Sequence, residues 1–132
     1  MASVVADTHA LLWMLKGTLR ERSPSAADAV DRALRAKALH VSVGSFLDLR
    51  YLVDSGRVSA QLLEEARSIV DSEPFTVVPL DLPVLDAMAR VPRETVPDPF
   101  DRIIAATALT LDLPLVSADE EIQEALAERV IW

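Results

Sequence analysis

The sequence predicts an α/β domain built on a parallel sheet that helices cover on both faces. Short runs of branched apolar residues, which suit buried strands, alternate with longer stretches whose apolar residues repeat at helical spacing. Helices between strands are typical of right-handed βαβ crossovers, which join parallel strands. With 132 residues, of which 51% are hydrophobic, we expect residues 1–132 to form one domain with a single core.

Local signals set the bounds of the elements in the first half of the chain. Ser23 followed by Pro24 is the pattern of a helix N-cap and a first helical residue. Gly17 and Gly56 suit the left-handed position that ends many helices. The predicted elements are, in chain order, a strand at 3–6, a helix at 8–16, a helix at 23–38, a strand at 39–43 and a helix at 45–55.

The clearest signal in the second half is "DPFD", residues 98–101, which follows a Pro-rich loop at 91–99. Asp98 is a good N-cap, and Pro99 suits the first helical position of the apolar stretch that follows. The predicted elements are a helix at 59–71, a strand at 75–80, helices at 81–90 and 100–111, a strand at 114–117, a helix at 120–128 and a last strand in "RVIW".

Aspartates stand where the predicted strands end. Asp7 follows the first strand, Asp48 lies one helical turn after the second, Asp119 follows the fourth, and Asp101 opens the helix that leads into the fourth. Because ligands of open parallel sheets bind at the carboxyl ends of the strands, we expect these four carboxylates to converge. Crowded carboxylates raise one another's pKa, and a divalent cation removes that cost. Oxygen ligands without cysteine suit Mg²⁺ or Mn²⁺ rather than zinc.

Three of these acids also have a purely structural explanation. Asp7 and Asp119 can cap the helices that begin after them, and Asp101 lies at the third position of a helix capped by Asp98. Acids near helix N-termini are also favoured by the helix dipole. We assign Asp98 the capping role alone.

Asp48 is harder to explain as a cap, because it lies inside the apolar stretch "GSFLDLRYLV". Ser45, three residues earlier, shares its helical face and is expected to support it. A buried acid in the middle of a helix needs a partner. If its role is structural, Arg50 or Arg102 is the expected partner.

Four segments together resemble the PIN-domain nucleases, most closely the VapC-type ribonuclease toxins of bacterial toxin–antitoxin pairs. They are "VVADTHALLW", "VSVGSFLDLRYLVDSGRV", "DPFDRIIAATAL" and "LPLVSADEEI", and they span nearly the whole chain. The resemblance implies a three-layer α/β/α domain with a mostly parallel central sheet of four to five strands. It also implies Mg²⁺- or Mn²⁺-dependent hydrolysis of RNA by a homodimer that an antitoxin neutralises.

The resemblance also implies roles for individual positions. Asp7 and Asp101 match direct metal ligands, and Asp119 matches an acid that more often acts through water. Thr8 and Ser117 match small hydroxyl residues that orient the acids. The expected catalytic set is therefore Asp7, Asp48, Asp101 and Asp119.

Asp48 departs from the family pattern, which usually has Glu at this position. The shorter side chain ends about 1.5 Å earlier, the length of one C–C bond. A misplacement of about 1 Å can cost on the order of a hundredfold in rate. We therefore expect weak activity unless the site compensates, for example by binding through water.

Neighbouring aromatic and basic residues have simpler interpretations. His9 points about 100° away from its helical neighbours, so we expect local contacts for it, and we expect Trp13 to pack against the protein. Arg90 and Arg93, in and beside the Pro-rich loop, either contact RNA phosphates or are solvated.

The net charge of −8 argues against a protein that binds phosphate backbones through a basic surface. It leaves open one that reaches phosphates through bound divalent cations. The absence of cysteine excludes disulfides and favours a cytosolic location, and the sequence shows no signal peptide and no apolar run long enough to span a membrane.

The predicted function is hydrolysis of RNA by an attacking water, which leaves a 5′-phosphate and a 3′-hydroxyl. From the resemblance alone, we expect a structured RNA such as a tRNA as substrate and a small antitoxin whose basic residue reaches the acidic site. Two alternatives stay open. One is another metal-dependent phosphohydrolase, although His9 stands where haloacid-dehalogenase phosphatases need a second Asp. The other is an inactive PIN-like interaction domain.

Overall fold

The computed structural model describes residues 2–132 and confirms the predicted fold class. Met1, the first residue of the predicted domain at 1–132, lies outside the described residues. One five-stranded sheet has the order β3-β2-β1-β4-β5, and each neighbouring pair is parallel. The strands are β1 (Val4–Ala6), β2 (Leu39–Ser42), β3 (Phe75–Val78), β4 (Leu115–Val116) and β5 (Val130–Ile131).

The helices follow the predicted order with small differences in length. The expected helices at 81–90 and 120–128 each end in a 3₁₀ turn, and a four-residue helix, α2, was not predicted. The helices are α1 (Thr8–Leu15), α2 (Leu19–Arg22), α3 (Pro24–Arg35), α4 (Val43–Asp54), α5 (Ala60–Ile69), α6 (Leu82–Ala87), α7 (Pro99–Leu111) and α8 (Glu120–Leu126), with 3₁₀ turns η1 (Met88–Arg90) and η2 (Ala127–Arg129).

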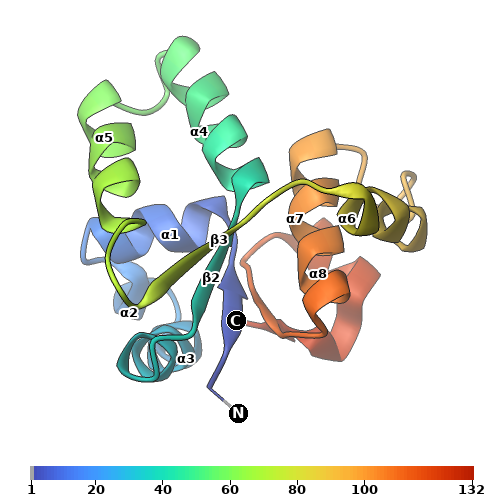
Figure 1. Ribbon diagram of the computed structural model, residues 1–132, viewed down its shortest axis with the longest axis horizontal. Coiled ribbons are helices and arrows are strands. Elements are labelled where there is room, and N and C mark those ends of the chain that lie inside the picture. The colour runs from blue at the N-terminus through green and yellow to red at the C-terminus, as the bar shows by residue number, and fades with distance from the viewer. Residues whose placement is uncertain (1) are drawn as a thin grey trace.

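The sheet separates two helical layers (Figure 1). Val5 of β1 packs with buried residues of α6, α7 and α8. Its neighbours Val4 and Ala6 point the other way and pack with buried residues of α3. Strand side chains alternate between faces, so one three-residue strand contributes to both layers.

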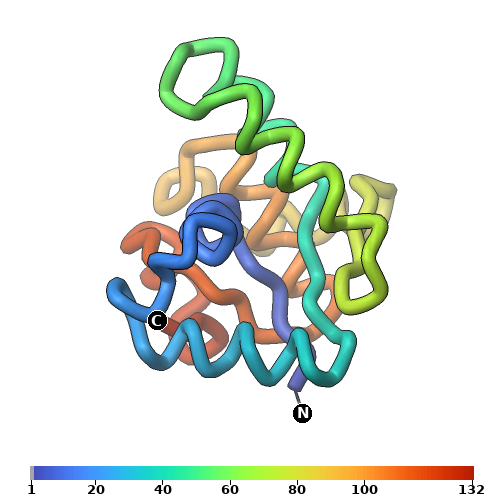
Figure 2. Tube along the Cα trace, turned by 90° about the vertical axis from the view of Figure 1, so that its left-hand side faces the viewer, coloured from blue at the N-terminus to red at the C-terminus, as the bar shows by residue number. Residues whose placement is uncertain are grey.

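A third cluster joins α1, α4 and α5 beyond the sheet, around Leu11, Val41 and Leu49. Figure 2 views this side directly, with α3 across the lower part and α5 descending on the right. In both views, the corner between α4 and α5 rises above the rest of the chain. The carboxyl ends of the strands therefore have α4 beside them as a wall.

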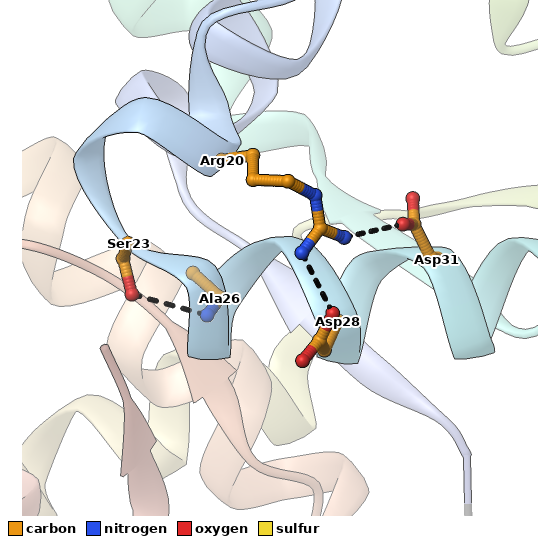
Figure 3. Close-up of polar contacts among 5 residues, drawn as sticks. All are labelled: Arg20, Ser23, Ala26, Asp28 and Asp31. Atoms are coloured by element: carbon orange, nitrogen blue, oxygen red, sulfur yellow. Dashed lines mark hydrogen bonds and ion pairs between the residues drawn. The ribbon is translucent and has the colours of Figure 1, made fainter.

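The corner between α2 and α3 shows how this protein satisfies charges at its surface (Figure 3). The Arg20 guanidinium donates to the carboxylates of Asp28 and Asp31, each at 2.9 Å. The Ser23 hydroxyl caps α3 by accepting from the backbone N–H of Ala26 at 3.1 Å. Because α2 has no side-chain cap and spans one turn, the sequence carries no start signal for it.

Within residues 2–132, no helix combines the length and hydrophobicity that crossing a bilayer requires.

Candidate functional site

A pocket of about 420 Å³ lies at the carboxyl edge of the sheet and gathers all four aspartates that the sequence singles out. They reach it from four different elements or loops, as expected for strands that run parallel. A fifth aspartate, Asp98, joins them. The lining residues are Asp7, Thr8, His9, Trp13, Asp48, Leu52, Arg57, Asp98, Asp101, Ala118 and Asp119.

Asp7 is positioned by the junction between β1 and α1. Its backbone N–H donates to Val116 O at 3.1 Å, which extends the pairing of β1 with β4 by one residue. Its carboxylate is buried and caps α1, since Oδ1 accepts from the backbone N–H of Ala10 at 2.8 Å. Burial raises the pKa of Asp7, and the Ser117 hydroxyl and the Ala10 N–H oppose that rise. Asp7 is thus both a cap and a wall of the pocket.

The start of α7 brings two acids to the same place. Asp98 caps the helix, with Oδ1 accepting from the N–H groups of Phe100 at 2.8 Å and Asp101 at 3.0 Å. Burial raises the pKa of Asp101 to about 7, and the charges of Asp98, Asp119, Asp48 and Asp7 add to the rise in that order. All five carboxylates therefore share one electrostatic environment.

Asp98 does more than the capping role assigned to it from the sequence. It caps α7 as expected, but it also lines the pocket, and among the neighbouring charges its charge raises the pKa of Asp101 most. The sequence contains a signal for this second role: Asp98 and Asp101 are three residues apart, and residues three apart in a helix lie on the same face.

Asp48 projects from the middle of α4 and is half-buried. Burial raises its pKa, and the charge of Asp98 adds to the rise, while the nearby Thr8 hydroxyl and His9 oppose it. The prediction that Arg50 or Arg102 pairs with Asp48 in a structural role is wrong. Arg50 Nε instead pairs with Asp54 at 3.5 Å, and Arg102 donates to the carbonyls of Met88 and Val91. Among residues 2–132, no ion pair includes Asp48.

Close contact between α4 and α7 holds Asp48 across from Asp101. Gly44 allows it, since a Cβ atom there would lie 2.8 Å from Cγ2 of Ile103. Nearby, the hydroxyls of Thr107 and Ser42 are 3.2 Å apart. Small residues at this crossing therefore set the width of the pocket.

Asp119 is held by the turn between β4 and α8. Its Oδ1 caps α8 by accepting from Ile122 N–H at 2.9 Å, and its own N–H donates to the Ser117 hydroxyl at 3.1 Å. Ser117 is buried and affects two of the acids, because its hydroxyl also lowers the pKa of Asp7. Its position suits the orienting role expected for it.

Two other hydroxyls that the sequence marks are buried without a hydrogen-bond partner, those of Thr8 and Ser45. Thr8 lines the pocket near Asp48, although not at ordinary hydrogen-bond geometry. Ser45 is fully buried on α4 and is not part of the lining, so the structure does not bring it to the site directly. An unpaired buried hydroxyl is costly, and Thr8 leaves a polar atom available at the pocket wall.

Besides Asp98, five lining residues were not expected there. His9 and Trp13 pair as rings, with centroids 5.6 Å apart, which agrees with the local contacts expected for them. Both also border the pocket, as do Leu52 from α4, Arg57 from the corner after α4, and Ala118. Leu52 lies one turn after Asp48 on the same face of α4, whereas no strand end or motif in the sequence marks Arg57.

The donor set fits a hard divalent cation. Carboxylate oxygens are the ligands that Mg²⁺ and Mn²⁺ prefer, and none of the five aspartates forms an ion pair with a residue in 2–132. Capping engages one oxygen each of Asp7 and Asp119, which leaves the second oxygen for another partner. As the side chains stand in residues 2–132, no three acidic or histidine groups surround a single point closely enough to hold an ion. Binding therefore requires the carboxylates to turn inward.

Comparison with known proteins adds a family and two similar folds. The family model described as PIN domain matches residues 4–128. Structural similarity extends to a toxin–antitoxin complex from Klebsiella pneumoniae, with a TM-score of 0.63 and 17% identity over 98% of this chain and 97% of that one. FitAcB from Neisseria gonorrhoeae gives a TM-score of 0.64 and 20% identity over 96% and 95%. At these identities the likeness shows a shared fold. No curated protein matches the sequence.

Proposed function

The chain belongs to the PIN domain family, and from that premise we propose that it is a metal-dependent endoribonuclease toxin of the VapC type. PIN domains are generally nucleases that depend on divalent metal ions. The proposal adds an RNA substrate, Mg²⁺ or Mn²⁺ as the ion, and residues 1–132 as one PIN domain.

One observation carries the proposal: five aspartates that form no ion pair with a residue in 2–132 surround a single pocket, and burial, together with their mutual repulsion, raises the pKa of Asp101 to about 7. Capping accounts for three of the aspartates but not for the crowding of five charges, because a serine would cap as well and crowded, partly buried charges are costly. A bound divalent cation offsets the repulsion between the carboxylates, and the relief of that repulsion adds to the affinity for the cation.

The residues divide the work as follows. Asp7 and Asp101 would hold the ion, Asp119 would assist through water, and Asp48 would complete the acidic ring from α4. Ser117 and Thr8 would orient the acids from behind. A divalent ion bound there supplies positive charge to phosphoryl oxygens and lowers the pKa of a water. The expected products are a 5′-phosphate and a 3′-hydroxyl.

We also propose a homodimer and a small antitoxin partner. Two features support an interface. Val43, Leu47 and Tyr51 form an exposed apolar stripe along α4, at a spacing of four residues, and Leu80, Leu82 and Leu85 expose further apolar surface around α6. The acidic pocket itself suits a basic antitoxin residue by charge. A structured RNA such as a tRNA and a cytoplasmic location remain part of the proposal.

Asp48 favours a second candidate, a PIN-like domain with weak or no catalysis. Its carboxylate is one bond shorter than the usual Glu, and it is only half-buried at the pocket wall. If the shorter side chain fails to reach the ion, the domain keeps its fold and partners but loses turnover.

The test is cleavage of total cellular RNA by purified protein in Mg²⁺ or Mn²⁺ against EDTA, with Asp7→Asn as the site variant. The matched control is Asp81→Asn, since Asp81 caps α6 through Val84 N–H and lies outside the pocket. Asn is as good a cap as Asp, so both variants keep their helices. We expect metal-dependent discrete fragments from the wild type and Asp81→Asn and none from Asp7→Asn. Cleavage that persists in EDTA or in Asp7→Asn would contradict the proposal.

A further inference from the structure

We propose that Arg57 is a substrate-binding residue that contacts a backbone phosphate of a polynucleotide, one removed from the phosphate at the aspartates. The inference rests on the proposed nuclease function and adds to it a residue that contacts the substrate away from the metal site. The substrate would be a chain with at least two phosphates, rather than a single phosphate ester.

The backbone of Arg57 is fixed by the way α4 ends. Gly56 takes a left-handed conformation, with φ of +77°. The N–H of Arg57 then donates to Leu52 O at 2.9 Å, and the N–H of Gly56 donates to Val53 O at 3.0 Å. These two bonds form a Schellman motif, which turns the chain back toward the last turns of the helix. Arg57 is therefore presented to the pocket by a defined turn and not by a loose loop.

Arg57 is the permanently charged cation among the pocket-lining residues in 2–132, and it faces five aspartates there. Nevertheless it forms no ion pair with any described residue, whereas Arg20, Arg50 and Arg129 each do. Its exposed guanidinium thus keeps all its donors for a ligand. The planar fork of Arg matches phosphate oxygens in a bidentate way.

The position of Arg57 along α4 separates it from the metal-binding end of the pocket. Asp48 and Leu52 both line the pocket and are one turn apart on the same helical face, a rise of about 6 Å. The N–H of Arg57 that donates to Leu52 O lies about one further turn along the helix axis, so its side chain starts about two turns beyond Asp48. A phosphate at the aspartates and a phosphate at Arg57 are therefore two different groups of one strand.

The experiment measures binding of a fluorescently labelled single-stranded RNA of about 20 nucleotides in Ca²⁺, as a function of salt. Ca²⁺ takes the same oxygen ligands as Mg²⁺ with looser geometry. Loss of one phosphate contact on a single strand reduces the slope of log K against log salt by about 0.7. We expect that reduction, with a loss of affinity of about tenfold, in Arg57→Ala, and a return toward the wild-type slope in Arg57→Lys.

The matched control is Arg50→Ala, which removes an exposed arginine of α4 that pairs with Asp54 and lies outside the pocket. Its slope should equal that of the wild type. Equal slopes for wild type and Arg57→Ala, equal reductions in both alanine variants, or no RNA binding by the wild type would overturn the inference. If the RNA is bound with the expected difference in slope but is not cleaved with any of the metal ions, this inference holds and the proposed nuclease function is wrong.

Discussion

Two groups of aspartates in this protein have opposite surroundings. Asp28 and Asp31 lie on the exposed face of α3, and both receive hydrogen bonds from Arg20 (Figure 3). The aspartates of the pocket are more crowded and mostly more buried, but no ion pair with a described residue satisfies them. The protein thus neutralises its acids where water could have solvated them, and leaves them unpaired where solvation is poorest.

The helix caps show a similar contrast, except at α6, which lies outside the pocket and is capped by Asp81. Helices α3, α4 and α5 are capped by serines, Ser23, Ser42 and Ser59. The three helices that begin at the pocket, α1, α7 and α8, are capped by aspartates, Asp7, Asp98 and Asp119. Serine caps about as well as aspartate. The charge at the pocket therefore exceeds what capping requires, and the capping and metal-binding interpretations of these residues are compatible.

The largest effect is expected when one of the unpaired aspartates of the pocket is replaced. Asp101→Asn removes the acid whose pKa is raised to about 7, while keeping its shape, and should lower RNA cleavage by about a thousandfold or more, because a direct ligand is lost. Asp28→Asn removes an equal charge from α3 and should stay within about twofold of the wild type. The measurement is the initial rate of RNA cleavage in Mg²⁺. Similar losses in both variants would mean that net charge, and not the site, matters.

A smaller effect should come from lengthening the acid on α4. Asp48→Glu moves the carboxylate about 1.5 Å further into the pocket and should raise the cleavage rate by about tenfold to a hundredfold. The same assay with single-turnover conditions isolates the chemical step. A slower Asp48→Glu variant would show that the site has already adapted to the shorter side chain.

A further effect is expected from the packing of the two helices beside the pocket: Gly44→Ala should widen the pocket by separating α4 from α7. The added methyl group would meet Ile103 Cγ2 at 2.8 Å, and overpacking of this kind costs about 1–3 kcal/mol in free energy of unfolding. Cleavage should fall as well, since Asp48 moves with α4. Urea titration and the RNA assay check both effects. Gly17→Ala is the control for destabilisation alone: Gly17 has φ of +73°, which strains alanine, but it lies outside the pocket, so stability should fall while cleavage is kept.

The smallest effect is expected at the paired acids. Arg20→Ala leaves Asp28 and Asp31 exposed to water, so the midpoint of thermal unfolding should fall by less than in Gly44→Ala. In about 1 M NaCl the difference from the wild type should nearly vanish, because charges are screened within about 3 Å. A salt-independent loss would indicate that Arg20 acts through packing and not through charge.

The sequence was sufficient to locate the acids that follow strands. It was not sufficient to predict which side chains surround these acids. Asp7 and Asp119 are placed by strand ends, and parallel strands must bring their ends together, so their meeting could be predicted. The partners of Arg50 and Arg102 could not, since they depend on side-chain directions and on the carbonyls that η1 leaves open. Arg57 was missed because Gly56 indicates where α4 ends but not which residue after it borders the pocket.

The central claim is that the unpaired charge of the pocket is held for a cation, and Asp101 tests it most directly. Its folded-state pKa of about 7 exceeds the ordinary value of 3.8, so the folded protein holds this proton more tightly than the unfolded chain. The free energy of unfolding therefore falls as pH rises from about 4 to about 7 and stays low above that. Because the side chain is partly exposed, we expect a discounted loss of about 1 kcal/mol.

The measurement is urea unfolding of wild type and Asp101→Asn at about pH 5 and pH 8, without metal and with Mg²⁺ or Mn²⁺. Without metal at pH 8, Asp101→Asn should be the more stable of the two, and its stability should depend less on pH. Added metal should stabilise the wild type and have much less effect on the variant, because binding to the folded state raises the free energy of unfolding. A variant that is less stable at pH 8 without metal, or that gains as much from metal as the wild type, would contradict the account.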